Sequence, residues 1–315
     1  MRFLLGRPCM RLMLAAVALC TLAVPTAAHA YCRTTTQQLP PNYSPSRGCF
    51  TQGLFLFWRN ACVSYSINQA GSRNIPYEEA KRVIDDAFGT WMRAECADGN
   101  PPGIAVSNIG AATCGEVRYN GDSPNQNVIV FRDDGWPYSD PNSTLGLTTV
   151  TFNADTGEIY DADMEINSSA RNLSTSDQVP ANGFDLASVI THEAGHFFGL
   201  AHATDARSTM FASYKPGTAA LRTLAPDDVA GLCAIYPDPS IRVVSSAVSA
   251  NQTIVADACD PNPRHGFTAE CSTPKREEKC AATPRPTASW AASGSVGLAI
   301  AGVFVARRRR ARRPR

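Results

Sequence analysis

The stretch of residues 184–210 constrains this chain more than any other part of it. The letters H-E-A-G-H place His192 and His196 four residues apart, and His202 follows six residues later. On an α-helix, a spacing of four puts two imidazoles on one face, one turn apart, where both can bind one metal ion. The chain therefore has to fold so that a helix and the turn after it meet at a metal site.

The sequence also indicates where this helix begins and ends. Asp185 is suited to accept hydrogen bonds from the free N–H groups of a first turn, and apolar residues recur at helical spacing after it. We predict a helix from residue 186 to about 198. Gly199 then lets the chain leave in a left-handed conformation that other residues resist. That turn brings His202 back towards the first two histidines.

Three neutral imidazoles and one open position are typical of a catalytic zinc, whereas a structural zinc is closed by four protein ligands. The fourth position would hold water. Glu193 lies beside a ligand without being one, so it can take the proton of that water as it attacks a carbonyl carbon. The pattern predicts one catalytic Zn²⁺ bound by His192, His196 and His202, with Glu193 as the general base.

The full pattern H-E-x-x-H-x-x-G-x-x-H, followed by Met210, resembles the metzincin clan of zinc endopeptidases. Met210 matches the methionine of the turn beneath the metal in that clan. The resemblance implies an α+β catalytic domain with a twisted mixed sheet, a backing helix, the zinc-binding helix and a small C-terminal subdomain. The cleft would lie between the edge strand of the sheet and the segment after Met210, and extended peptides would bind there by β-augmentation.

Two further stretches resemble the matrixin branch of this clan. Residues 224–237 are similar to the final helix of a matrixin domain, and residues 157–167 to the strand before the active-site helix in bacterial matrixin-type proteases. Ala203 departs from the serine that matrixins usually carry after the third histidine. Matrix metalloproteases have a histidine for a second, structural zinc in the comparable strand. This strand has none, so we expect one zinc and take residues 53–237 as the protease domain.

The loop after the methionine has a role implied by the same resemblance. Residues 211–216 would line the pocket for the side chain that follows the scissile bond. Tyr214 in this loop either reaches the oxyanion of the reaction or forms a wall of that pocket.

The acidic residues of the strand at 157–167 leave two interpretations open. Asp161, Asp163 and Glu165 alternate with Tyr160, Ala162, Met164 and Ile166, so the acids should share one face of the strand and the apolar residues the other. Three neighbouring carboxylates repel one another, so either solvent screens them or Ca²⁺ collects some of them with nearby carbonyls.

Other elements are expected from periodicity and turn residues. A helix should begin near Pro76 and pack an apolar face that ends at Trp91 on the sheet. Short strands are predicted at 62–67, 104–109, 127–131 and 148–152.

The net charge of +1 conceals an acidic body. Ten of the 29 basic residues lie in the first 11 and the last nine positions, so 19 basic residues face 28 acidic ones in between. An acidic domain argues against a nucleic-acid partner. We expect protein or peptide substrates and a monomer.

Residues 1–30 have the arginines, apolar run and small residues of a secretory signal. Nine cysteines remain after its removal, and in an exported chain they indicate disulfides, enough for four bridges if Cys280 has a separate role. Residues 31–52 form an N-terminal arm that we expect to be stapled through Cys32 and Cys49. The letters Arg47-Gly48-Cys49 faintly resemble an inhibitory propeptide with a zinc-binding cysteine, but half of a disulfide is the favoured interpretation of Cys49.

The C-terminal part looks like a tether. Residues 238–290 read as a linker or stalk, pinned locally by Cys259 and Cys271, before a short apolar transmembrane sorting helix at 291–306 and a basic tail at 307–315. A cysteine, a short apolar helix and terminal arginines resemble the sorting tags of myxobacterial surface proteins, which would make Cys280 the processing or anchoring residue. A plain tail anchor, the alternative, would give the same topology.

These features predict an exported zinc endopeptidase, either secreted or attached to the cell surface or outer membrane, that hydrolyses extracellular proteins. The membrane would be reached only through the C-terminal tag. The alternative is a non-catalytic zinc-binding surface or adhesion module. Metal binding alone does not require Glu193, which favours the enzyme.

Overall fold

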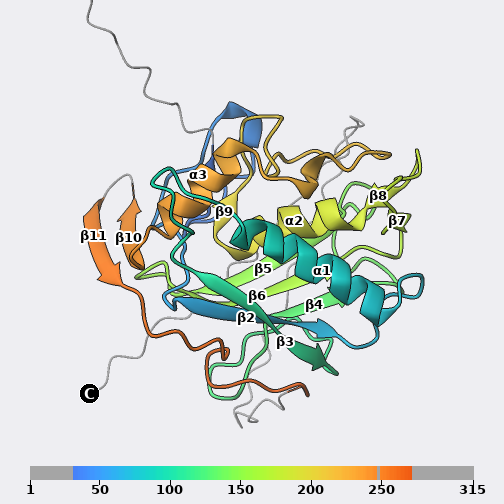
Figure 1. The fold of residues 1–315 in the computed structure, drawn as a ribbon, viewed down its shortest axis with the longest axis horizontal. Helices are drawn as coiled ribbons and strands as arrows, with labels where there is room; N and C mark the ends of the chain where they lie inside the picture. Colours follow the sequence, from blue (N-terminus) through green and yellow to red (C-terminus); the bar gives the residue numbers. More distant parts are fainter. Residues whose placement is uncertain (1–30, 247–248, 272–315) are drawn as a thin grey trace, which may run out of the picture.

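The computed structural model describes residues 31–246 and 249–271 and centres on a five-stranded mixed sheet (Figure 1). Three neighbouring pairs of strands run parallel, and only the last strand, at one edge, is antiparallel to its neighbour. The strand order is β3 (Ala105–Ala112), β2 (Cys62–Asn68), β4 (Val128–Phe131), β6 (Ile159–Ile166) and β5 (Gly146–Phe152).

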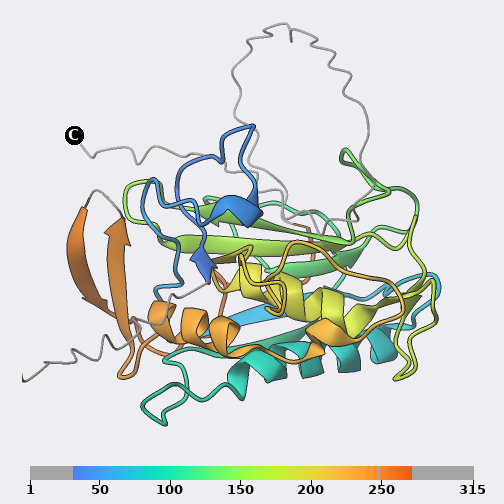
Figure 2. The same cartoon turned by 90° about the horizontal axis from the view of Figure 1, so that it is seen from above.

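Two helices cover one face of this sheet (Figures 1 and 2). Helix α1 (Tyr77–Met92) buries the apolar face expected from its sequence, and α2 (Leu186–Phe197) packs beside it. The indole N–H of Trp91 donates to the carbonyl of Thr191 over 2.9 Å, which ties the backing helix to the helix that carries the histidines. The predicted α+β architecture of the metzincin type is confirmed.

A small subdomain follows the sheet and α2 along the chain. It contains a 3₁₀ helix η2 (Ala220–Arg222) and α3 (Pro226–Ile235), a helix within residues 224–237 as the resemblance implied, and the proline suits its first turn. Tyr236 at its end donates its hydroxyl to the carbonyl of Phe198 over 2.8 Å. The remaining short elements are β1 (Cys32–Arg33), η1 (Pro45–Arg47), β7 (Leu173–Ser174), β8 (Phe184–Asp185) and β9 (Leu200–Ala201).

Strand β6 alternates as predicted except at Tyr160. A register shift opposite Thr151 and Phe152 makes Tyr160 the extra residue of a β-bulge. Its ring therefore leaves the apolar face and lies 4.0 Å from the guanidinium carbon of Arg264, whereas Ile159 takes the core position.

The acidic face of β6 is buried, so the expectation of a solvated face is wrong. Asp161, Asp163 and Glu165 are each 1% exposed. The sheet face that they share is covered by later parts of the chain, where the Ser64 hydroxyl donates to the carbonyl of Pro261 and the amide of Thr113 donates to Ala269 over 2.8 Å.

The segment after Pro237 differs from the linker that we expected. Strands β10 (Ile241–Ser246) and β11 (Ser249–Val255) form a hairpin, and Arg242 is fully buried against the domain. Its guanidinium lies over the ring of Tyr236 and donates to four carbonyl oxygens, those of Trp58 (2.8 Å), Asn60 (2.9 Å), Gly103 (3.0 Å) and Ile241 (3.3 Å).

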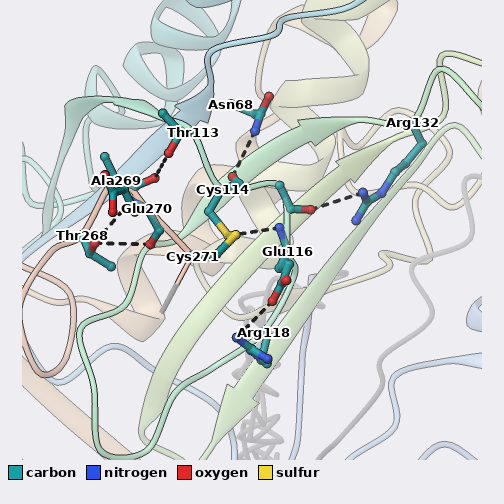
Figure 3. Close-up of a disulfide and its surroundings, with 11 residues drawn as sticks. Asn68, Thr113, Cys114, Glu116, Arg118, Arg132, Thr268, Ala269, Glu270 and Cys271 are labelled. Carbon is teal, nitrogen blue, oxygen red and sulfur yellow. Dashed lines mark hydrogen bonds and ion pairs between the residues drawn. A yellow bond between two sulfur atoms is a disulfide. The ribbon is translucent and has the colours of Figure 1, made fainter. Parts of the chain in front are cut away.

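Four disulfides join the eight cysteines of the described residues. Cys32–Cys49 staples the N-terminal arm as predicted, so Cys49 is not available as a metal ligand. Cys259 and Cys271 do not pin the segment locally, because each bridges back to the protease domain. The other three pairs are Cys62–Cys259, Cys96–Cys233 and Cys114–Cys271. Figure 3 shows the Cys114–Cys271 bridge, together with the hydrogen bonds that Asn68 donates to the carbonyl of Cys114 and that Thr113 donates to the carbonyl of Ala269.

Several terminal predictions lie outside the described residues: the signal at 1–30, Cys280, the sorting helix at 291–306 and the basic tail at 307–315. Within residues 31–246 and 249–271, none of the helices has the length and apolar character needed to span a membrane.

Arg242 provides a test of how firmly the hairpin belongs to the domain. Replacing it by alanine removes a buried cation that donates to four carbonyls, so we expect Arg242→Ala to lower the free energy of unfolding by about 3 kcal/mol. Urea denaturation at neutral pH measures this. Arg82→Ala, at a side chain that is 62% exposed, is the matched control and should stay within about 0.5 kcal/mol. Equal stability of the two variants would mean that the hairpin does not support the domain.

Candidate metal centre

Helix α2 starts where the sequence predicts, and its first turn is held from two sides. The carboxylate of Asp185 accepts a hydrogen bond from the amide of Ser188 over 2.9 Å. It also receives two bonds from the guanidinium of Arg222, at 2.7 and 2.8 Å. A fork of this kind fixes orientation as well as charge, so the helix is positioned rigidly against η2.

The turn after α2 brings the third histidine to the first two. Gly199 adopts φ +95°, and its amide donates to the carbonyl of His196. The Nε2 atoms of His196 and His202 lie 3.3 Å apart, and one ring nitrogen from each of the three histidines falls within 4.8 Å of the others. The structure thus brings together the three residues that the sequence singled out.

The protonation of two of the rings is set by backbone carbonyls. Nδ1 of His192 donates to the carbonyl of Thr209 over 2.6 Å, and Nδ1 of His196 donates to that of Leu200 over 2.9 Å. A ring that donates from Nδ1 keeps its lone pair on Nε2 when neutral. Nε2 of His192 is buried without a hydrogen-bond partner, which is the condition of a ligand nitrogen awaiting a cation.

Burial keeps all three imidazoles neutral. It lowers the pKa of His192 to about 4 and that of His196 to about 3, and it holds the pKa of His202 well below its usual value. Neutral imidazoles in a group of three suit zinc, and the remaining coordination position would belong to water. The site therefore fits the ion that the sequence implied.

Glu193 is fully buried beside the histidines, and its two oxygens differ. Oε2 accepts a hydrogen bond of 2.7 Å from the hydroxyl of Thr148 on β5, whereas Oε1 has no hydrogen-bond partner. Burial raises the pKa of this carboxyl to about 8. Gly146 on the same strand is close, because a Cβ at that position would lie 2.8 Å from Oε1. The edge strand thus positions the acid and leaves one oxygen unoccupied.

Met210 lies under the metal helix. A Cβ on Gly195 would come within 2.1 Å of its sulfur, so the methionine packs where only glycine fits between the two zinc-binding positions of the helix. Its carbonyl accepts from the amide of Ala203 over 2.8 Å, next to His202. This is the place that the resemblance assigned to the methionine turn.

Asp228, whose importance the sequence did not reveal, organises that turn. Its carboxylate accepts from the Ser208 hydroxyl and from the amides of Thr209 (2.8 Å), Met210 (3.1 Å) and Ala225 (2.8 Å). In the sequence it is only one of two neighbouring acids near the start of the helix expected within residues 224–237. Because Thr209 carries the carbonyl that orients the first histidine, Asp228 acts on the metal site through the backbone.

Two other sequence hypotheses stay predictions. The Tyr214 hydroxyl donates to the carbonyl of Thr218 in its own loop, and its ring packs beside Phe184. Among the described residues, Asp161, Asp163 and Glu165 do not form one of the groups of three side chains whose ligand atoms lie within 4.8 Å of one another, and a Ca²⁺ site that combines some of them with carbonyls stays a prediction.

The three acids of β6 have separate partners instead. Glu165 binds Arg132 and the hydroxyl of Tyr138. Asp163 accepts from the amide of Val128 over 2.8 Å and shares a hydrogen bond with Asp161, whose Oδ1 is otherwise unpaired. Burial raises the pKa of both carboxyls of this pair, and we infer that the pair holds a proton.

The mixed sheet, the backing helix and the three-histidine site have the arrangement of the metzincin-type fold. Residues 126–237 match the matrixin family. The chain is 26% identical over 193 residues to Metalloendoproteinase 1-MMP of Arabidopsis thaliana, which covers 60% of this chain and 47% of that protein. It is 27% identical over 179 residues to human Matrix metalloproteinase-20 (57% and 32%) and 25% identical over 205 residues to human Neutrophil collagenase (65% and 38%).

The chain spans less than half of the length of each of these relatives.

The role of Asp228 in positioning the metal site can be tested by comparing it with Asp227, the neighbouring acid on α3. Asp228→Asn removes acceptors that hold the methionine turn, so we expect zinc affinity to fall about ten- to hundredfold. Asp227→Asn, the adjacent acid outside that network, should stay within twofold. Competition with a fluorescent chelator measures both. Equal zinc affinity in the two variants would contradict a positioning role for Asp228.

The Asp161–Asp163 pair predicts a pH dependence of stability. Both pKa values are raised in the folded protein, so the folded pair binds its proton more tightly than the unfolded chain does, and this stability is lost as the pH rises. Asp161→Asn should melt several degrees above the parent at pH 8 and close to it at pH 5. A parent melting temperature that rises with Ca²⁺, and does not in Asp161→Asn, would instead support a calcium site.

Proposed function

We propose that this protein is an exported zinc-dependent endopeptidase that hydrolyses peptide bonds of extracellular proteins, with Glu193 as the general base. One observation carries the proposal. Three neutral, buried imidazoles present ring nitrogens to one point, beside a buried carboxylate that keeps one oxygen free. A structural metal site would need neither the carboxylate nor an open position.

The roles of the chain's own residues follow from their contacts. His192, His196 and His202 would hold the zinc. When bound, the ion would polarise both a water molecule and the substrate carbonyl, and its charge would favour ionised Glu193. Glu193 would take the proton of that water through Oε1 and hand it to the leaving nitrogen, while Thr148 holds Oε2 in place.

The edge strand supports an extended peptide as the substrate. Strand β5 is the last of the five-stranded sheet, and among the described residues no further strand pairs with its outer edge. The same strand contacts the catalytic acid through Thr148 and Gly146. A peptide that adds to this edge by β-augmentation would therefore lie directly beside Glu193.

The last part of the proposal is that the protein is exported and acts as a monomer. Four disulfides support an oxidising compartment. We propose that residues 1–30 direct export, and that residues 291–306 with Cys280 attach the protein to the cell surface. The acidic body supports protein substrates rather than nucleic acid.

The second candidate is a zinc-binding surface module without turnover. The buried Glu193 disfavours this module, because burying a carboxyl group costs free energy and a module without catalysis has no use for that group. Catalysis requires Glu193 and zinc binding alone does not, so a substitution of Glu193 separates the two functions.

Glu193→Ala should abolish peptidase activity while zinc remains bound. We expect kcat/KM on a quenched fluorescent peptide to fall at least about a hundredfold, because a positioned general base contributes that much or more. Metal content is measured on the same preparation. His192→Ala is the comparison variant, and it should lose both zinc and activity.

Unchanged cleavage by Glu193→Ala would remove the proposed mechanism. Zinc binding by a parent protein that cleaves no peptide in a broad library would favour the non-catalytic module. Activity that survives complete removal of zinc by a chelator would exclude the metal site as the active site.

A further inference from the structure

The N-terminal arm, residues 31–52, is attached to the strand that follows the zinc-binding helix. Strand β1 pairs with β9 in a register that sets Arg33 opposite Leu200. The amide of Thr34 extends this contact by donating to the carbonyl of Gly199 over 2.9 Å. The arm lies outside the residues that match the matrixin family, so that match assigns it no role at the metal centre.

The side chain of Thr34 makes a second contact, and this one leads to a zinc-binding residue. Its hydroxyl donates to the carbonyl of Leu200 over 2.9 Å, and Thr34 is 6% exposed. The same carbonyl accepts the bond of 2.9 Å from Nδ1 of His196. A carbonyl oxygen has two lone pairs, so it can accept both bonds. One carbonyl group therefore connects the arm to the second histidine of the metal centre.

The first histidine is held in a comparable way. Nδ1 of His192 donates to the carbonyl of Thr209, and the amide of Thr209 donates in turn to the carboxylate of Asp228. Each of the two rings thus donates to a carbonyl whose residue is held by a side chain from another part of the chain. A ligand whose orientation is fixed before binding loses less freedom when the metal binds, so both arrangements favour zinc affinity.

The backbone at Thr34 is held by contacts that do not involve its hydroxyl. Its amide donates to Gly199, and its carbonyl accepts from the amide of Leu56 over 2.8 Å. The Cys32–Cys49 bridge also ties the arm into a closed loop two residues before Thr34. Because these contacts remain when the hydroxyl is removed, a substitution at Thr34 tests the bond to Leu200 rather than the attachment of the arm.

We propose that Thr34 is a positioning residue of the metal centre: its hydroxyl fixes the Leu200 carbonyl, and that carbonyl holds the His196 ring in the orientation that zinc requires. This rests on the zinc site of the proposed peptidase and adds the N-terminal arm to the parts of the chain that set zinc affinity. The alternative is that the hydroxyl competes with the imidazole for the carbonyl. Without the hydroxyl, zinc affinity falls if Thr34 positions the carbonyl and rises if it competes with the ring.

The test is the zinc affinity of the disulfide-bonded protein, measured by competition with a fluorescent chelator. Thr34→Val keeps the shape of the side chain and removes the donor. Because Thr34 acts through one carbonyl, we expect affinity to fall about three- to tenfold, less than when a direct partner of a metal ligand is lost. Thr34→Ser restores the donor and should stay within about twofold of the parent.

Thr36→Val is the matched control in the same arm. Thr36 is 4% exposed, and its hydroxyl accepts from the amide of Leu54 over 3.0 Å, a contact that involves neither α2 nor β9. Both valine variants lose one buried hydrogen bond, so both should lower the melting temperature of the zinc-free protein by similar amounts. Only Thr34→Val should also weaken zinc binding and change the visible spectrum of the protein loaded with Co²⁺, because that spectrum depends on how the ligands surround the ion.

Zinc affinity that Thr34→Val leaves unchanged or raises would overturn the positioning role and leave the peptidase standing. An equal loss of affinity in Thr36→Val, or no recovery in Thr34→Ser, would overturn it as well, because the arm would then act through stability alone. Thr34→Ala, which is smaller and also lacks the donor, gives the same comparison if the valine variant does not fold. If the parent binds no zinc and cuts no peptide, the proposed function fails and the role of Thr34 with it.

Discussion

The structure depends on the hydrogen bonds that two backbone carbonyls accept from histidine rings. The carbonyls of Thr209 and Leu200 hold Nδ1 of His192 and His196, which leaves Nε2 of both rings available to a metal. Both carbonyls belong to segments that follow α2 in the chain. The methionine turn and the arm, each attached to one of these segments, therefore belong to the metal centre although neither contributes a ligand.

A chain of contacts connects the site to distant parts of the molecule. Asp228 ties the methionine turn to α3, and Tyr236 at the end of α3 contacts Phe198 after the zinc helix. Arg242 then stacks on Tyr236 and donates to the carbonyl of Trp58, shortly before β2. The described part of the C-terminal segment, which composition alone presented as a linker, closes this chain of contacts and is bound to the domain by two disulfides.

Short-range sequence patterns predict the structure correctly wherever a single helix or turn determines it. The start of α2 at Leu186, its cap at Asp185 and the turn at Gly199 all came from short-range signals. The failures lie where partners are far apart in sequence. Asp161 and Asp163 looked solvent-exposed or metal-bound, because nothing nearby reveals the later segment that covers them. Tyr160 was assigned to the wrong face, because a bulge depends on the partner strand.

The sequence by itself determined the metal chemistry: two histidines and a glutamate at helical spacing, with a third histidine just after the helix, are local facts, and they carry the same meaning in any fold that forms that helix and turn. Only the tertiary structure decided which oxygen of Glu193 stays free, which carbonyls orient the rings and what lies beside His202. Those properties require Thr148, Asp228 and the N-terminal arm to come within a few ångströms of α2. Contacts between residues so far apart along the chain are set by packing and disulfide closure, which no short pattern encodes.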